Sequence, residues 1–387
     1  MWHLLPYAHL AAHASPGCGS TPPVEAGSWN RFPIEVEDAS QEGGYATRHY
    51  LLDVPAVYKR DTPAMLILDY HGFYDHAKSE RNEDQLRAFV DQQGINAVTV
   101  YPVGSGDQWS GDSFAWNVEG NGINTDNGPL GPTCLAPRRQ YDGWNDRYTC
   151  FDSCSYGPKG CDATWGCNFA SCMDDTMFTK RLIKHLTHKL CIDLSHIHVT
   201  GISAGALMVY QVALDFSDLV ASAAPVAGSR IYGYNYSPNH AVALLDVHGL
   251  DDVYVPSNRS NGFEGSHPHG TTLSHDRFIY HEVPHVMKSF ASTGQCGAGG
   301  NLPYPTKFDG TREFSCNQPH GTCTSTGVSI VQCVGRWGHT WPLHNVHPFA
   351  YADLVLDFFR RHPKSAGAEA WAPPKWLFDE EVESVPE

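Results

Sequence analysis

The sequence is short of positive charge. Only 26 of its 387 residues are lysine or arginine, against 42 aspartates and glutamates, and the formal net charge is −16. Nucleic acids and anionic membrane surfaces attract basic proteins, so this balance argues against both as partners. No apolar run reaches the roughly 18 residues that a membrane-spanning helix needs. The composition therefore predicts a chain that binds neither nucleic acid nor membrane.

Cys-x-x-Cys pairs are also absent, although the chain has 12 cysteines. Zinc sites usually contain such pairs, so disulfides are the favoured interpretation, and they form in an oxidising compartment. We therefore expect secretion, and two glycosylation sequons, at Asn235 and Asn258, agree with it. Six cysteines crowd into one loop-rich segment: Cys134, Cys150, Cys154, Cys161, Cys167 and Cys172. For four others, one hypothesis pairs Cys296 with Cys333 and Cys316 with Cys323.

The N-terminus lacks the basic start of a typical signal peptide. Residues 2–14 are mildly apolar and end in a small-x-small pattern, Ala12 to Ala14, so residues 1–40 are expected to hold a weak signal peptide and an irregular lead-in over 15–40. We expect the catalytic domain over 41–365. Residues 366–387 are expected to form a loose tail.

Apolar runs and helical periodicity alternate through the domain, which predicts an α/β fold with a mostly parallel, doubly wound sheet. Residues 103–172 have little periodicity and hold the cysteine cluster. They predict a disulfide-stapled insertion over one end of the sheet, with a separately folding module as the alternative. Strands are expected at 45–58 (an edge strand), 64–70, 97–101, 196–200, 221–226, 242–247 and 328–334. Helices are expected at 80–93, 174–190, 204–216, 284–293 and 349–361.

One stretch carries a Gly-x-Ser-x-Gly pattern between a predicted strand and a predicted helix. Gly201, Ser203 and Gly205 occupy its fixed positions. In a nucleophile elbow the serine sits at a strained strand-to-helix turn and its hydroxyl projects from the sheet. Small neighbours are needed because the two backbones pass close together there. The pattern predicts that Ser203 is a nucleophile; the alternative is an ordinary turn in which Ser203 caps the helix.

A serine hydroxyl needs a general base, usually a histidine that a carboxylate orients. In an open parallel sheet these groups gather at the carboxyl ends of successive strands, in the order Ser, Asp, His. Two later loops meet this requirement. The loop after strand 242–247 offers Asp251 or Asp252 as the acid. The loop after strand 328–334 offers His339, between a glycine and a proline.

An oxyanion hole needs two backbone N–H groups. We expect one from Ala204, directly after the nucleophile, and the other from Phe73, in the loop after strand 64–70. His71 in that loop is expected to be a structural residue of the turn.

Four aromatic residues in predicted loops at the same end of the sheet are candidates for substrate binding: Tyr74, Trp109, Trp116 and Trp341. The alternative for the first three is a role in anchoring their loops. For Trp341, closeness to His339 favours contact with substrate.

His281 to His285 matches His-Glu-x-x-His, a zinc protease signature. That site needs both histidines one turn apart on a continuous helix. Pro284 would break such a helix, but it fits the first turn of a helix that begins there. We therefore expect His281 to precede the helix, and we predict no metal site and no cofactor.

Four motifs in this order resemble the secreted α/β-hydrolase esterases of the polyhydroxybutyrate depolymerase and feruloyl/acetylxylan esterase group. They are His71-Gly72, the stretch from Gly201 to Gly205, the stretch from His248 to Asp252, and the stretch from Gly338 to Pro342. The resemblance covers roughly residues 60–360 and implies the α/β-hydrolase fold. Matching the spacing His-Gly-x-x-Asp selects Asp252 over Asp251 as the acid.

The resemblance implies a secreted serine carboxylic ester hydrolase with Ser203, Asp252 and His339 as its triad. A polyester depolymerase of the polyhydroxybutyrate type is the first expectation, and a feruloyl or acetylxylan esterase acting on plant or algal polysaccharide esters is the alternative. A serine peptidase on the same fold is a further alternative. A catalytically silent hydrolase-like binding protein is the alternative from another class. The expected partner is an ester substrate, and no oligomeric state is predicted.

Overall fold

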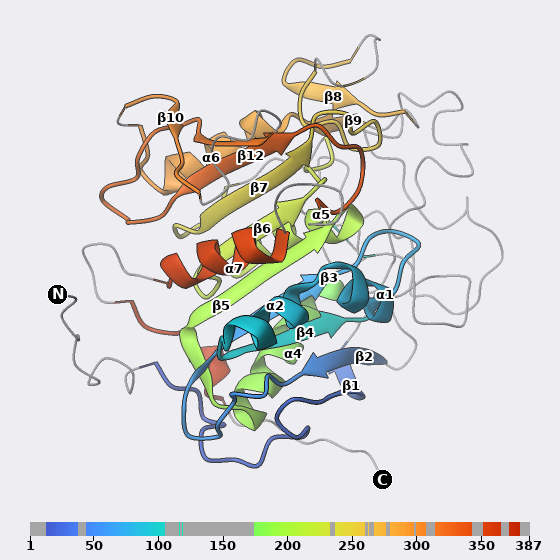
Figure 1. The fold of residues 1–387 in the computed structure, drawn as a ribbon, viewed down its shortest axis with the longest axis vertical. Coiled ribbons are helices and arrows are strands. Elements are labelled where there is room, and N and C mark those ends of the chain that lie inside the picture. Colours follow the sequence, from blue (N-terminus) through green and yellow to red (C-terminus); the bar gives the residue numbers. More distant parts are fainter. Residues whose placement is uncertain are drawn as a thin grey trace.

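A ten-stranded sheet runs through the part of the chain that the structure describes (Figure 1). The computed structural model describes residues 13–37, 44–104, 116, 118, 174–232, 237–259, 262, 267–275, 279–297, 299–306, 314–342, 351–364 and 371–379. From one edge to the other, the strands are β1 (Trp29–Glu37), β2 (Tyr45–Asp53), β4 (Ala97–Pro102), β3 (Ala64–Tyr70), β5 (Ile192–Ile202), β6 (Ser222–Val226), β7 (Ala243–Gly249), β12 (Ile330–Gly335), β11 (Phe314–Gln318) and β10 (Leu302–Pro303).

The centre of the sheet, from β4 to β12, is parallel, and the strands added at both edges are antiparallel. The expectation of a mostly parallel sheet is confirmed. Because the carboxyl ends of parallel strands meet along one edge, residues in the loops that follow them come together there. A separate two-stranded sheet pairs β8 (Thr271–Leu273) with β9 (Ile279–His281).

Helices cover both faces of the sheet. They are α1 (Ala77–Glu83), α2 (Leu86–Gln93), α4 (Asp175–Lys189), α5 (Ala204–Asp215), α6 (Val283–Thr293) and α7 (Tyr351–Arg361), with a short 3₁₀ helix at Lys375–Leu377. Figure 1 shows α2 and α7 on the face towards the viewer, and they share one hydrophobic cluster there. Helices α4, α5 and α6 contribute to the cluster on the other face. Among the described residues, no helix is both long and apolar enough to cross a bilayer.

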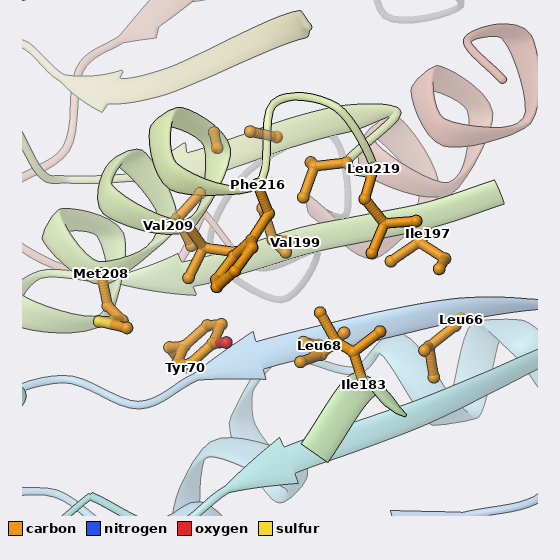
Figure 2. Packing of buried hydrophobic residues seen from close by; sticks show 14 of the residues in the cluster. Leu66, Leu68, Tyr70, Ile183, Ile197, Val199, Met208, Val209, Phe216 and Leu219 are labelled. Carbon is orange, nitrogen blue, oxygen red and sulfur yellow. The ribbon is translucent and has the colours of Figure 1, made fainter. Parts of the chain in front are cut away.

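The core beneath the site is built on alternate residues of β3. Leu66, Leu68 and Tyr70 point to one face and are fully buried. Burying an aliphatic side chain of this size contributes about 2 kcal/mol before the entropy of ordering it is counted. Figure 2 shows these residues beside side chains of β5 and α5, Ile197, Val199, Met208 and Val209, and beside Phe216, which directly follows α5. This packing fixes α5 on the sheet and thereby the turn that precedes it.

Two expectations for the N-terminal half are wrong. The irregular lead-in over residues 15–40 contains β1, in which Ile34 and Val36 alternate with exposed residues, so strand periodicity was present. Because β1 forms the edge, the strand expected at the edge, β2, is the second strand of the sheet.

The single helix expected over residues 80–93 is also wrong. It is divided into α1 and α2, and Gln85 between them has a φ of 62°. The cause is the buried side chain of Asp84, which accepts hydrogen bonds from the Leu86 N–H and from the Tyr101 hydroxyl, each at 2.9 Å. A tertiary contact therefore ends α1. Gly94 ends α2 in the left-handed conformation.

Disulfides join distant parts of the described chain. Cys18 pairs with Cys191 at the start of β5, which ties the N-terminal segment to the sheet. The pairing hypothesis for the other four described cysteines is wrong: Cys296 pairs with Cys323, and Cys316 pairs with Cys333. The last two face each other in the register of β11 and β12, so strand pairing decides the bond. The cysteine cluster expected over 103–172 and the sequon at Asn235 lie outside the described residues.

Candidate active site

Ser203 lies at the turn between β5 and α5, at the carboxyl edge of the parallel strands. Its φ of 58° and ψ of −121° fall in a sparsely populated region of backbone conformation. Such a conformation costs a residue other than glycine about 1–3 kcal/mol, and strain of this kind clusters at functional sites. A strained serine at a strand-to-helix turn is the geometry of a nucleophile elbow.

Two glycines allow the elbow to pass close to the end of β3. A Cβ added at Gly205 would lie 1.8 Å from the Tyr70 carbonyl oxygen, and one at Gly201 would lie 2.4 Å from the same atom. Cβ atoms essentially never come within 3.0 Å of such an atom. Both positions therefore require glycine, and the close approach brings the loop after β3 beside Ser203.

The loops after β7 and β12 bring Asp252 and His339 together at the same edge. Their strands are parallel neighbours, so both loops leave the sheet side by side. A Cβ at Gly249 would lie 2.1 Å from the Trp337 carbonyl oxygen, and the Asp251 N–H donates to that oxygen at 3.0 Å. The two loops are thus in direct contact.

The structure brings Ser203, His339 and Asp252 into one hydrogen-bonded chain. The distance from His339 Nε2 to Ser203 Oγ is 2.8 Å, and the distance from His339 Nδ1 to Asp252 Oδ2 is 2.8 Å. Because the Asp252 carboxylate accepts at Nδ1, the proton of a neutral imidazole lies on Nδ1 and Nε2 accepts from the serine hydroxyl. The His339 side chain is 19% exposed, so substrate and water can reach it.

The second oxygen of Asp252 is also satisfied. Oδ1 accepts the backbone N–H groups of Tyr254 and Val255, each at 2.9 Å. The residue is fully buried, whereas the neighbouring Asp251 is exposed. These contacts fix the carboxylate and orient it towards His339, and they explain why this loop needs an aspartate whose side chain folds back on its own backbone.

The two residues expected at the oxyanion hole flank Ser203. Ala204 is the first residue of α5, where the N–H has no acceptor within the helix. Phe73 lies in the loop after β3, and this loop rests on the elbow: a Cβ at Gly72 would lie 3.5 Å from Ser203 Cβ. The phenyl ring of Phe73 is half-buried against the main core.

His71 anchors that loop from below. It is fully buried, its Nδ1 donates to the Gly72 carbonyl at 2.8 Å, and its Nε2 accepts the Gly104 N–H at 3.0 Å. Burial lowers the pKa of His71 to about 4, so the ring is neutral at ordinary pH. With both nitrogens engaged, His71 fits the structural role expected for it.

Two aromatic residues expected to bind substrate are instead buried. Trp116 has no exposed surface, donates its indole N–H to the His71 carbonyl at 2.8 Å, and packs edge-on against Tyr70 at 5.1 Å. Trp341 is 4% exposed and its ring lies 4.6 Å from that of Tyr351 in α7. The expectation is wrong for both, because each anchors a loop to the core.

Tyr74 is 61% exposed beside the ring of Phe73, so it remains a candidate for contact with substrate. Trp109 lies outside the described residues. Tyr254, which no motif singled out, is 50% exposed, and its ring lies 5.4 Å from that of His339. Its position two residues after Asp252 is the signal that could have pointed to it.

The His-Glu-x-x-His match does not lie on one helix. His281 ends β9, Glu282 is the N-cap of α6, and Pro284 stands in the first turn. The rings of His281 and His285 stack at 5.3 Å. Within the described residues, no group of three or more potential ligands is arranged to hold a metal ion.

The parallel sheet, the elbow at Ser203 and the loops after β7 and β12 are the features of the α/β-hydrolase fold. No protein-family model matches the chain. Among curated proteins, it is 32% identical over 89 residues to feruloyl esterase B of Piromyces equi, and 30% identical over 105 residues to probable feruloyl esterase C of Aspergillus clavatus. These matches confirm the resemblance to the feruloyl and acetylxylan esterase group.

The matched stretches are partial. They cover 22% and 27% of this chain, and 17% and 37% of the two relatives. The chain thus spans well under two thirds of the length of either protein. Among solved structures, an acetyl xylan esterase from Aspergillus awamori covers 87% of this chain and 100% of its own, with a TM-score of 0.48 and 14% identity.

Proposed function

We propose that this protein is a serine carboxylic ester hydrolase with Ser203, His339 and Asp252 as its triad. One observation carries the proposal: the two ring nitrogens of His339 bond the Ser203 hydroxyl and the Asp252 carboxylate at 2.8 Å each. A general base must lie within hydrogen-bonding distance of the proton that it removes. A hydrolase-like binding protein needs neither this contact nor the strained serine.

In the proposed reaction Ser203 Oγ attacks the ester carbonyl carbon while its proton passes to His339 Nε2. The carbonyl electron pair moves onto oxygen and then returns, and the alcohol leaves with the proton from Nε2. Water next gives a proton to His339 and attacks the acyl carbon. Ser203 leaves with that proton, and the carboxylic acid is released. Asp252 stabilises the imidazolium in both halves, and no cofactor enters.

The N–H groups of Ala204 and Phe73 are proposed to hold the oxyanion. The position of Ala204 at the start of α5 supports its role, because the helix N-terminus favours negative charge. The contact of Gly72 with Ser203 supports the role of the next residue, Phe73. Loss of one such donor typically lowers kcat by about 10²–10³-fold.

The proposed substrate is an ester carried by a polymer. The names of the curated relatives support feruloyl or acetyl esters of plant polysaccharides, and the motifs support these and polyhydroxybutyrate-type polyesters. Tyr74 and Tyr254 are proposed to contact the substrate, because Tyr254 is exposed beside the ring of His339 and Tyr74 is exposed beside Phe73 in the loop after β3. Comparing kcat/KM for methyl ferulate, acetylated xylan and 3-hydroxybutyrate oligomers separates the alternatives.

The disulfides of the described chain support secretion into an oxidising compartment. Expression with and without residues 1–14 in a secreting host, followed by assay of the medium, tests this proposal. Retention of both forms inside the cell would contradict it.

Replacing Ser203 with alanine tests the proposed chemistry. We expect hydrolysis of p-nitrophenyl butyrate to fall by roughly a thousandfold or more with an unchanged melting temperature. The matched control is Ser289→Ala, since that hydroxyl donates to the Val286 carbonyl within α6. Full activity in Ser203→Ala rules out the serine mechanism, and an inactive wild-type protein favours a binding role.

A further inference from the structure

His248 is a buried histidine behind the triad that the proposed mechanism does not use. It lies on β7, its side chain is fully buried, and its ring is in contact with two carboxylates. The His248 ring faces Asp246 of β7 and, in the loop after β7, Asp252 and Val255. The Asp246 carboxylate in turn faces Tyr210 of α5 and Gln332 of β12.

The Nε2 atom of His248 must carry a proton. It lies 2.6 Å from the carbonyl oxygen of Val255, and a carbonyl oxygen can only accept a hydrogen bond. The same nitrogen lies 3.6 Å from Oδ2 of Asp252. Its N–H is therefore shared between a backbone acceptor and the carboxylate of the triad.

The Nδ1 atom of His248 also faces acceptors. It lies 3.5 Å from Oδ1 of Asp246. The Asp246 carboxylate already accepts from the Tyr210 hydroxyl at 3.2 Å and from the Gln332 side-chain amide at 3.3 Å. A lone pair on Nδ1 would point at the lone pairs of this carboxylate, whereas an N–H there completes its hydrogen bonds.

The nearby charges together affect the pKa of His248 more than its burial does. Burial alone would lower the pKa of His248, but the nearby Asp246 and Asp252 carboxylates and the Val255 carbonyl raise it above its ordinary value. His71 is equally buried, but its two ring nitrogens bond the backbone groups of Gly72 and Gly104, and its pKa is lowered. The difference between the two histidines is the pair of carboxylates.

We propose that His248 is an imidazolium held between Asp246 and Asp252, and that it is a positioning residue which fixes the triad acid and limits the negative charge behind His339. This inference rests on the proposed role of His339 as the base. Both His248 Nε2 and His339 Nδ1 approach the same oxygen of Asp252, so these nitrogens lie within about 6.4 Å of each other. At that separation a charge on one ring is felt by the other.

The imidazolium has a definite effect on the resting enzyme. With His248 charged, the two buried carboxylates leave one net negative charge, which the protonation of His339 during catalysis neutralises. With His248 neutral, two negative charges would favour a proton on His339 before substrate arrives. A protonated His339 cannot accept the proton of Ser203, so the enzyme would need a higher pH to work.

The pH dependence of kcat/KM tests this proposal. We expect His248→Gln, which removes the charge and keeps a hydrogen-bonding side chain, to shift the acid limb of the profile upward by roughly one pH unit. Asp246→Asn removes one of the two negative charges, so it should not shift the limb upward. In the double variant only the Asp252 carboxylate remains, which again leaves one net negative charge, so the limb should return close to its wild-type position.

His198→Gln is the matched control. His198 is buried on β5 and contacts the Ser222 hydroxyl at 2.6 Å, about 16 Å along the strand from Ser203. Its replacement should lower the melting temperature without moving the acid limb. A shift of the limb in this variant equal to that in His248→Gln would overturn the proposal, because it would follow from lost packing.

A second measurement keeps the proposal testable if His248→Gln does not fold. Nitrogen-15 NMR of the wild-type protein at neutral pH should show two protonated ring nitrogens for His248, and a single protonated nitrogen overturns the proposal. An unchanged acid limb in a folded, active His248→Gln variant overturns it too. Neither result bears on the proposed function, which is tested independently and is ruled out if Ser203→Ala retains full activity.

Discussion

Replacing Gly205 with alanine should strongly destabilise the protein, because α5 lies too close to β3 to admit a methyl group. The added Cβ would lie 1.8 Å from the Tyr70 carbonyl oxygen and 2.6 Å from that of His71. Restoring an allowed contact requires the helix and the strand to separate by more than about 1 Å. Tyr70 cannot yield easily, since it is fully buried and its hydroxyl bonds Thr179 at 2.9 Å.

Overpacking typically costs about 1–3 kcal/mol, and here backbone atoms stand on both sides of the contact. We therefore expect a loss of about 3 kcal/mol or more. Circular dichroism melting with intact disulfides should show a fall in Tm of roughly 4 °C or more for a chain of this size. Esterase activity should fall as well, because Ser203 moves with the start of α5.

Two other glycines provide controls. Gly94 has a φ of 63° and no heavy atom within 4 Å of the added Cβ, so Gly94→Ala measures the backbone cost alone, about 1 kcal/mol. At Gly72 the methyl group would meet Ser203 Cβ at 3.5 Å, an ordinary contact, so the effect on Tm should be small. If Gly205→Ala melts no lower than Gly94→Ala, the close approach of the elbow to β3 is refuted.

Three further predictions concern other parts of the molecule. Burial and the nearby Glu80 raise the pKa of Asp69 well above its ordinary 3.8, so the folded wild type keeps a proton that the unfolded chain loses as the pH rises, and it loses stability over that range. The Tm of Asp69→Asn should therefore rise relative to the Tm of the wild type between about pH 5 and pH 8. A difference in Tm that stays constant with pH would contradict this. Replacing Tyr254 with alanine should raise KM for methyl ferulate by roughly 2–10-fold, while Tyr45→Ala, which alters a similarly exposed ring on β2, should not. Replacing both Cys18 and Cys191 with serine removes a disulfide between residues 173 positions apart, and it should lower the free energy of unfolding in urea titrations by up to about 5 kcal/mol. An unchanged urea midpoint would show that this disulfide does not contribute to stability.

The sheet was largely predictable because its central strands are continuous apolar runs. Strand β3 has the predicted bounds, and every residue in it is buried. The break between α1 and α2 was not predictable in the same way, because no glycine or proline stands there. It depends on Asp84 meeting Tyr101, a contact between residues that only the folded chain brings together.

Some residues of the candidate site could likewise be predicted from the sequence, and others could not. Ser203, Asp252 and His339 were found from spacing and chain order, because the sheet topology delivers those positions to one edge. The aromatic residues were misjudged at Trp116 and Trp341, since a loop tryptophan is exposed or buried according to neighbours that sequence spacing does not reveal.

His248 and Tyr254 were overlooked for a related reason. Their importance lies in distances to Asp252 and His339 that follow from the folding of one short loop. The motif from His248 to Asp252 marked the loop, but it gave no reason to treat the histidine as charged.

The most direct test of the central claim is to identify the residue that a fluorophosphonate modifies. Mass spectrometry of the digested protein should find the phosphonyl group on Ser203, because the proposed mechanism has His339 activate this hydroxyl. Labelling should be absent in Ser203→Ala and greatly slowed in His339→Ala. A wild-type protein that labels at another serine, or that remains unlabelled while it hydrolyses esters, would contradict the account.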